Sequence, residues 1–283
     1  MGRLRDKMDA DLKLAGRSES TRSHYLGCAV LFVKFFRLPP ESMGEQEVRK
    51  FLLFLAETRK LSVGRYLQYL GALKFLYGVT LGRPEVVAGI PWPKMKRRRL
   101  DVLTRDEVAR VLDAAASPYW RAFLTTAYAA GLRRMEVAAL RGSDIDSRSG
   151  LIRVAHGKGD KAREVMLDPT LLTTLREHWR RHHLPGPWLF PARRRVGWAD
   201  HPVGLGQASN AFREAHLAAK IGRRLTLHGL RHAFGTHLLE DGVDLYTLQQ
   251  LLGHDRLETT TRYTQVRTDR IRATPSPLAK LRA

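Results

Sequence analysis

The sequence of 283 residues predicts a mainly α protein with two domains, the second of which also contains a small β-hairpin or sheet (α+β). Three observations lead to this prediction. Apolar residues repeat with helical spacing through residues 1–90, a basic and proline-containing segment follows at 91–100, and helical spacing then resumes with one short β-like interruption.

Residues 1–90 carry the apolar faces of amphipathic helices. Side chains spaced i, i+3 or i+4 and i+7 share one face of a helix, and three segments follow this spacing. Their apolar positions are Tyr25, Ala29, Phe32, Val33 and Phe36; Val48, Phe51, Leu52 and Leu55; and Tyr66, Leu70, Leu73 and Tyr77. With a short N-terminal helix, they predict a bundle of about four helices.

The segment 91–100, "PWPKMKRRRL", is predicted to be an exposed linker. It contains two prolines and five basic residues, without an acidic residue or helical periodicity. A linker with this charge is suited to lie along a phosphate backbone. The residues expected to bind DNA there are Lys94, Lys96, Arg97, Arg98 and Arg99.

Residues 101–283 are predicted to form the second domain. Thr104 and Glu107 form a capping box that starts its first helix, and helices continue to about Arg141. The segments "LIRVA" and "REVML" have β-like character and flank "HGKGDKA", whose glycines suit a hairpin turn. Further helices are expected near 169–183, 203–219, 228–241, 245–252 and 257–266.

The charge of the chain points to a polyanionic partner. Lys and Arg total 49 and Asp and Glu total 28, which gives a net charge of +21. All three regions contribute, with +6 in residues 1–90, +5 in 91–100 and +10 in 101–283. A basic protein with solvated arginines is the simpler alternative, but nucleic acid is the usual partner at this charge. An acidic membrane surface is disfavoured because no basic amphipathic helix exposes aromatic side chains.

Other features limit the cellular setting. The longest apolar run is about eight residues, far below the roughly 20 that a membrane-spanning helix needs. The beginning of the chain, "MGRLRDKMDA", is charged and lacks the apolar core of a signal peptide. A single cysteine, Cys28, excludes an internal disulfide and a cluster of cysteine metal ligands. We therefore expect a cytoplasmic protein without a metal or other cofactor.

A set of reactive side chains is ordered along the second domain. Metal-free cutting and rejoining of DNA requires a nucleophile such as Tyr, fixed cations around the phosphate and an acid for the leaving oxygen. Arginine suits the cationic role because it stays charged and can bind two phosphate oxygens. The candidate residues are Arg133, Lys158, His228, Arg231, His254 and Tyr263.

Each candidate also has a structural interpretation when taken alone. Arg133 could cap a helix, Lys158 could be a solvated turn residue, and Tyr263 could belong to the core. His228 and His232 are four residues apart, as in a metal-binding pair, but the intervening Glu of the zinc-protease motif is missing. The ordered set as a whole is more informative than any of its members.

Four motifs carry a resemblance to a known family. They are "GLRRMEV", "GKGDK", "HGLRHAFGTHLLEDG" and "LQQLLGHDRLETTTRYTQV", and their order and spacing cover essentially all of residues 101–266. The sequence resembles the tyrosine recombinase, or phage integrase, family, and is most similar to Xer-type and mobile-element recombinases. The resemblance implies a core-binding DNA-binding domain at 1–90 and a catalytic domain at 101–283.

The resemblance also implies a role for each candidate residue. Arg133 and Arg231 would hold the non-bridging oxygens of the scissile phosphate, His254 would hydrogen-bond the phosphate, and Glu136 would orient the site without touching DNA. Tyr263 would attack and form a 3′-phosphotyrosyl link.

The proton-transfer roles fall to two further residues. Lys158 would protonate the leaving 5′ oxygen from the minor groove, and His228 would assist proton transfer at the nucleophile.

The implied function is site-specific recombination between paired DNA sites. The expected partner is double-stranded DNA with inverted-repeat core sites, bound by a tetramer of this chain, with accessory proteins left open. Two alternatives stay open at this stage. One is DNA relaxation by a type IB topoisomerase-like enzyme, and the other is a DNA-binding relative that has lost catalysis.

Overall fold

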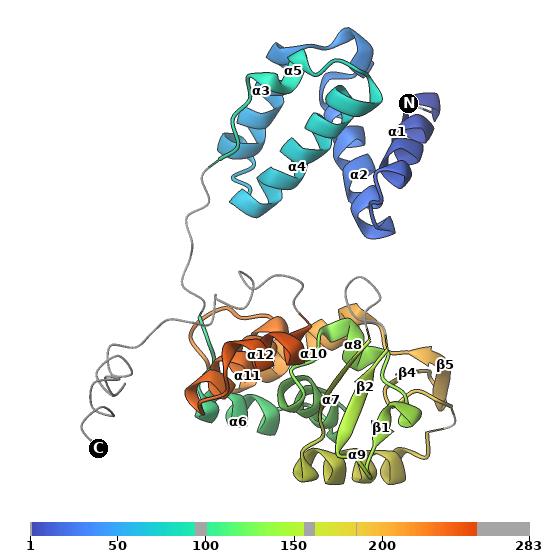
Figure 1. Cartoon of the computed structure of the whole chain (residues 1–283), viewed down its shortest axis with the longest axis vertical. Coiled ribbons are helices and arrows are strands. Elements are labelled where there is room, and N and C mark those ends of the chain that lie inside the picture. Colours follow the sequence, from blue (N-terminus) through green and yellow to red (C-terminus); the bar gives the residue numbers. More distant parts are fainter. Residues whose placement is uncertain (1, 94–100, 156–161, 185, 254–283) are drawn as a thin grey trace, which may run out of the picture. The chain divides into compact units, whose positions relative to one another are not determined.

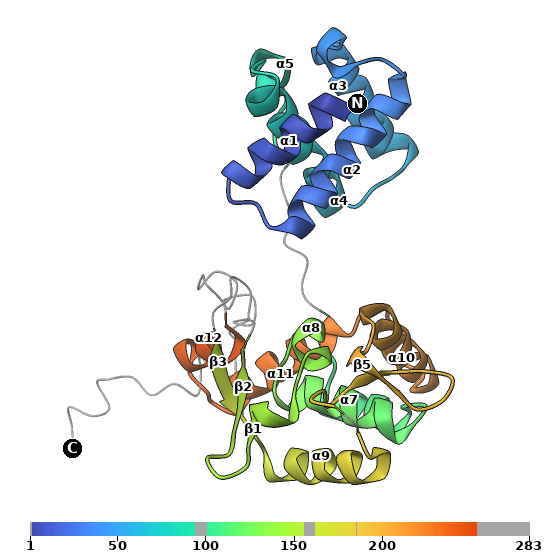
Figure 2. The ribbon, with the colours of Figure 1, turned by 90° about the vertical axis from the view of Figure 1, so that its right-hand side faces the viewer.

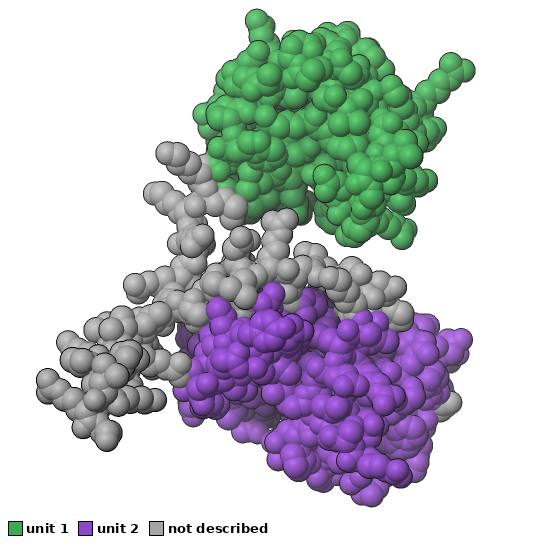
Figure 3. Space-filling view, viewed as in Figure 1, with its two compact units in different colours: residues 1–98 green, residues 99–283 purple. Residues whose placement is uncertain are grey.

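The computed structural model describes residues 2–93, 101–155, 162–184 and 186–253, and the chain forms two compact units (Figure 3). Unit 1 comprises residues 1–98 and unit 2 comprises residues 99–283.

Unit 1 is entirely helical in its described part. Its α-helices are α1 (Gly2–Leu14), α2 (Glu19–Phe36), α3 (Glu45–Leu53), α4 (Val63–Phe75) and α5 (Glu85–Ala88). Helices α3 and α4 each continue into a π-helical turn, over Phe54–Thr58 and Leu76–Thr80. The four longer helices confirm the predicted bundle, and the short α5 was not predicted.

The core of unit 1 is formed by the predicted apolar faces. Phe32 is fully buried and contacts Phe51 and Tyr77 edge-on, with ring centroids 5.2 Å and 6.2 Å away. The buried Tyr77 hydroxyl donates a hydrogen bond to the Pro40 carbonyl at 3.1 Å, so the core includes no unsatisfied phenol there.

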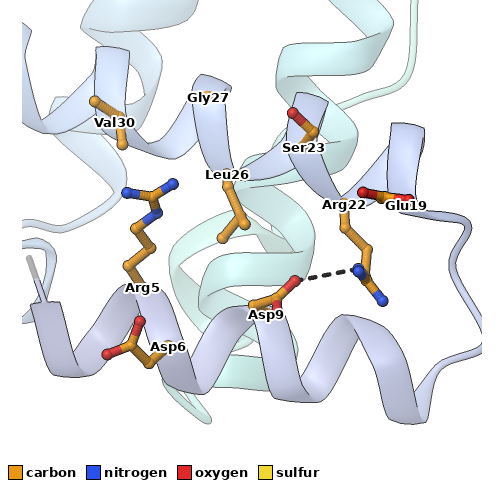
Figure 4. A pocket seen from close by; sticks show the side chains of 9 residues that line it. All are labelled: Arg5, Asp6, Asp9, Glu19, Arg22, Ser23, Leu26, Gly27 and Val30. Carbon is orange, nitrogen blue, oxygen red and sulfur yellow. Dashed lines mark ion pairs between the residues drawn. The ribbon is translucent and has the colours of Figure 1, made fainter.

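An open groove of about 600 Å³ lies between α1 and α2 (Figure 4). Leu26 and Val30 are among its apolar lining residues. Acidic and basic side chains also line it, including an ion pair of 3.2 Å between Asp9 and Arg22. Because acidic and basic groups alternate around it, this groove does not present the concentrated positive charge that an anion would need.

Unit 2 contains seven α-helices and five strands within its described residues. The helices are α6 (Arg105–Asp113), α7 (Pro118–Ala129), α8 (Arg134–Ala138), α9 (Pro169–His182), α10 (Leu205–Ala218), α11 (His228–Glu240) and α12 (Leu245–Leu252). The strands are β1 (Ile145–Asp146), β2 (Leu151–Val154), β3 (Arg163–Met166), β4 (Pro191–Arg193) and β5 (Trp198–Pro202). Of the five helices predicted after the hairpin, four are confirmed, and the one at 257–266 lies outside the described residues.

The predicted hairpin is confirmed by the antiparallel pairing of β2 with β3. Ile152 pairs with Val165, and both side chains are buried against the helices. Strand β1 extends this sheet, and β4 and β5 form a second, two-stranded sheet that the sequence did not predict. The latter segment, "PARRRVGWADHP", is polar and bounded by prolines, and its Trp198 stacks on the distant Tyr119.

Helix α7 is the centre of unit 2 (Figure 1). It packs against α6, α8, α9, α10 and α11, and it buries side chains on most of its circumference. The two hydroxyl groups among those buried positions both donate hydrogen bonds, Thr126 to the Ala122 carbonyl at 2.7 Å and Tyr119 to the Pro191 carbonyl at 2.8 Å. The loop that leaves α7 therefore starts from a rigid support.

Two further findings concern the described part of the chain. None of its helices combines the length and apolarity needed to cross a membrane. Nor do three or more His, Cys, Asp or Glu side chains gather there in an arrangement that could hold a metal ion.

Candidate active site

Four of the predicted site residues come together at the junction of three helices in unit 2. Arg133 and Glu136 belong to the start of α8, while His228 and Arg231 lie one turn apart in α11. The C-terminal end of α12 completes the cluster. Lys158, His254 and Tyr263 lie outside the described residues, as do the linker residues Lys94, Lys96, Arg97, Arg98 and Arg99.

A tight turn after α7 places Arg133. Gly131 has a φ of +58°, and a Cβ built at this position would lie 2.3 Å from the ring of Phe234 on α11. Only glycine meets both constraints, because it tolerates positive φ and has no side chain to clash. The Gly131 carbonyl accepts a hydrogen bond of 2.8 Å from Arg231 Nη1, so the turn also positions the second arginine.

Glu136 is the hub of the cluster. Its side chain is only 3% exposed, and its carboxylate accepts hydrogen bonds of 2.7 Å from the backbone N–H and from Nη1 of Arg133. Arg163 Nη1 and Nη2 donate to its two oxygens at 2.8 Å each. Arg231 Nη1 lies 3.8 Å from Glu136 Oε2. Four hydrogen bonds use about all the acceptor positions of a carboxylate, so Glu136 orients arginines and is unsuited to act as a base.

The charge state of Glu136 follows from these contacts. Burial by itself raises the pKa of its carboxyl, but the hydrogen bonds and charge of Arg163, together with Arg133, outweigh burial and hold the pKa at about 2. Glu136 is therefore ionised at neutral pH. One carboxylate then faces three guanidinium groups, which leaves the cluster with a net positive charge.

Arg163 is the site residue that the sequence analysis missed. It begins β3 and pairs across the hairpin with Val154, which is buried, and its own side chain is 9% exposed. The signal was present in the strand pattern, because Arg163 and the buried Val165 are two residues apart and therefore share the inner face. A charged residue on an inner face is unusual, and it indicates a buried partner.

The last carbonyl groups of α12 bind the same arginines. The Leu251 carbonyl accepts from Arg163 Nε at 2.9 Å, and the Gly253 carbonyl accepts from Arg133 Nη2 at 3.0 Å. The Leu252 carbonyl accepts from Arg133 Nη2 at 3.3 Å and also from Arg231 Nη2. The final carbonyls of a helix have no partner within the helix and carry partial negative charge. The arginines supply those partners and fix the end of α12.

His228 lies beside these cations in the first turn of α11. Partial burial of the ring lowers the pKa of His228, and the charges of Arg231 and Arg133 lower it further, while Glu136 opposes them. His228 as a whole residue is exposed, and its ring contacts the ring of His232 edge-on, with the ring centroids 4.5 Å apart. At neutral pH the imidazole is therefore neutral and able to accept a proton.

The cluster as a whole is suited to binding an oxyanion. Arg133 keeps 23% of its side chain exposed, whereas the side chain of Arg231 is only 1% exposed. Fixed guanidinium groups bind phosphate oxygens strongly and in defined directions. The arrangement can neutralise charge on a phosphate that undergoes substitution, next to a neutral imidazole.

Replacing Glu136 with Gln is expected to destabilise the protein by about 3 kcal/mol at pH 7, because the three arginines lose their buried counter-charge. The folded-state pKa of Glu136 lies below its ordinary value of 4.5, so this contribution is complete above that value. It declines as the pH falls toward about 2. Urea unfolding of both proteins at pH 7 and at steps down to pH 3, where part of the decline has occurred, measures the difference. A difference that grows on acidification would contradict the depressed pKa.

Both units of the chain are similar to known proteins. A model described as "Phage integrase family" matches residues 101–270, and one described as "Phage integrase, N-terminal SAM-like domain" matches residues 4–85. An integrase/recombinase of Sinorhizobium fredii, y4qK, is 39% identical over 98% of this chain and 89% of its own length. The tyrosine recombinase XerA of Pyrococcus horikoshii is 31% identical over 92% of this chain and 88% of its own length.

Solved structures show the same fold. A structure of lambda integrase as a tetramer bound to a Holliday junction aligns with a TM-score of 0.74 at 20% identity. The alignment covers 93% of this chain and 76% of that chain.

Proposed function

Because the chain belongs to the phage integrase family of tyrosine recombinases, whose members break and rejoin DNA, we propose that it catalyses site-specific recombination through a 3′-phosphotyrosyl intermediate. The observation that carries the proposal is the convergence of Arg133 and Arg231 on the end of α12. The chain continues from that end directly into His254 and, nine residues later, Tyr263. The guanidinium groups of Arg133 and Arg231 therefore lie where the segment that leads to Tyr263 begins.

In the proposed reaction, the Tyr263 oxygen attacks the scissile phosphorus and forms a phosphoester with the 3′ side of the DNA. The bond from phosphorus to the 5′ oxygen breaks. Arg133 and Arg231 bind the non-bridging oxygens, and His254 donates a hydrogen bond to the phosphate. Phosphoryl transfer depends mainly on positioning and charge stabilisation, which these residues supply. The new ester retains the energy of the broken one, so rejoining requires no ATP.

Two residues move protons in this scheme. His228 accepts the proton of the Tyr263 hydroxyl, and its lowered pKa supports this because a neutral imidazole is present at pH 7. Lys158 gives a proton to the departing 5′ oxygen. Its position in the sequence between β2 and β3 supports this role, because Arg163 at the start of β3 joins this pair of strands to the cluster through Glu136.

DNA binding is assigned to both units and to the segment between them. We propose a core-binding domain at 1–90, a phosphate-contacting linker at 91–100 and a catalytic domain at 101–283. The expected partner is duplex DNA with inverted-repeat core sites, held by four copies of this chain in the cytoplasm. The tetrameric form of lambda integrase on a Holliday junction supports the assembly.

Covalent capture of DNA tests the proposal. The protein is incubated in EDTA with a pool of nicked duplexes whose central sequence is randomised, so that cleavage releases a short fragment and traps the complex. We expect SDS-stable complexes whose DNA converges on one inverted repeat. Capture without sequence preference would favour the topoisomerase-like alternative. Failure to capture any duplex would favour a DNA-binding relative without catalysis, and capture only after adding a divalent metal would contradict the metal-free mechanism.

Comparison with relatives bears on the first alternative. The relatives reported above are named as integrases and recombinases, which favours recombination over DNA relaxation.

A further inference from the structure

Arg163, at the start of β3, connects two parts of the site that are far apart in the sequence, the start of α8 and the end of α12. Arg163 uses both terminal nitrogens on Glu136 and its Nε on the Leu251 carbonyl, with all three distances between 2.8 and 2.9 Å. One guanidinium therefore ties the start of α8 to the end of α12. Helix α12 lies against β3, consistent with this link (Figure 2).

The backbone of α12 is shaped to receive Arg163. The helix ends at Leu252 and is followed by the C-cap residue Gly253, which has a φ of +56°. A Cβ at this position would lie 2.9 Å from Arg163 Cδ and 3.3 Å from its Nε, so the arginine side chain packs directly on the glycine. A larger residue would have to displace the arginine and would also be strained at this φ. The fit of Gly253 to Arg163 indicates that their contact is a specific feature of the site.

Arg163 has few groups left for a substrate. Three of its five N–H donors are engaged with Glu136 and Leu251, and its side chain is 9% exposed. Arg133, in contrast, keeps 23% of its side chain exposed. Arg163 is thus placed to act through its neighbours.

We propose that Arg163 is a positioning residue for DNA cleavage, which fixes the end of α12 against Arg133 and Arg231 and so sets where the segment carrying His254 and Tyr263 begins. This inference rests on the proposed function. Its physical basis is the sensitivity of in-line substitution to geometry, since a misplacement of about 1 Å can reduce a rate by roughly 10²-fold.

The test separates DNA binding from cleavage. Arg163→Met removes all three hydrogen bonds but keeps a side chain of similar length. Arg153→Met is the matched control, because Arg153 lies on the neighbouring strand β2 and is 62% exposed at its side chain, and its ion pairs with described residues are both 3.6 Å long. Both variants lose one positive charge from the same sheet. Each is measured with one nicked duplex recovered by the covalent capture described above.

We expect Arg163→Met to slow single-turnover formation of the covalent complex by about 10²-fold at saturating DNA, with DNA affinity matching that of Arg153→Met. Arg153→Met should cleave at the rate of the unaltered protein. Arg163→Lys keeps the charge and can reach one acceptor, so it should cleave roughly tenfold faster than the Met variant. If Arg163→Met does not fold, slow cleavage by a folded, DNA-binding Arg163→Lys protein supports the proposal.

Three results would overturn the inference. The first is cleavage by Arg163→Met or by Arg163→Lys at the rate of the unaltered protein. The second is a loss of DNA affinity that fully accounts for the loss of cleavage. The third is a Lys variant that cleaves no faster than the Met variant. Failure of the unaltered protein to form any covalent complex would instead contradict the proposed function.

Discussion

Replacing Tyr263 with Phe is expected to abolish covalent capture of DNA while leaving DNA affinity largely unchanged. Only the hydroxyl oxygen acts as the nucleophile, and phenylalanine differs from tyrosine by this group alone. DNA affinity arises from many contacts between basic side chains and phosphates across a chain with a net charge of +21, so one hydroxyl contributes little to it. Capture is measured on denaturing gels and affinity by titration of a fluorescent duplex.

Tyr246 provides the matched control for this experiment. It lies in the first turn of α12 and is 67% exposed, so a Tyr246→Phe change should affect neither folding nor capture. Capture by the Tyr263→Phe protein would show that another residue is the nucleophile. Loss of capture in the Tyr246→Phe protein at the same time would make Tyr246 that residue.

Replacing Lys158 with Ala is expected to slow cleavage by roughly 10²- to 10⁴-fold, the range typical of a lost general acid. The defect should be largely relieved on DNA that carries sulfur in place of the bridging 5′ oxygen at the cut. A thiolate leaves without taking up a proton, so the missing acid is no longer needed. Single-turnover cleavage of oxygen- and sulfur-containing duplexes gives the ratio for each variant.

Arg133→Ala is the control for this rescue. Arg133 is proposed to stabilise charge on the non-bridging oxygens, and sulfur at the bridging position does not replace that interaction. Its defect should therefore persist on both substrates. Equal rescue of the two variants, or rescue of neither, would mean that Lys158 only positions DNA, and His228 would become the candidate acid.

The sequence predicted much of the fold because the signals for individual elements are local. Apolar spacing placed the helices of unit 1, the capping box at Thr104 and Glu107 is present at the start of α6, and the segments flanking "HGKGDKA" pair as β2 and β3. The second sheet was missed because its segment is polar and its contacts are distant, such as that of Trp198 with Tyr119, nearly 80 residues away in the sequence. Local patterns carry no information about such contacts.

The identities of the candidate residues also follow from the sequence. Motifs such as "GLRRMEV" and "HGLRHAFGTHLLEDG" contain chemically distinctive side chains at fixed spacing, and family membership is confirmed. The catalytic roles of all six candidates stay predictions, and Lys158, His254 and Tyr263 also lie outside the described part of the chain.

The sequence by itself therefore determined most of the helices, the β2–β3 hairpin, the family of the chain and the candidate side chains for chemistry. Only the tertiary structure decided how Glu136 is used, since its oxygens bind Arg163, 27 residues away, as well as the neighbouring Arg133. It also decided that Arg133 meets the Leu252 carbonyl 119 residues further along the chain. The physical reason is that helix and strand formation depend on neighbouring residues, whereas these contacts depend on how α8, α11, α12 and β3 pack around one core.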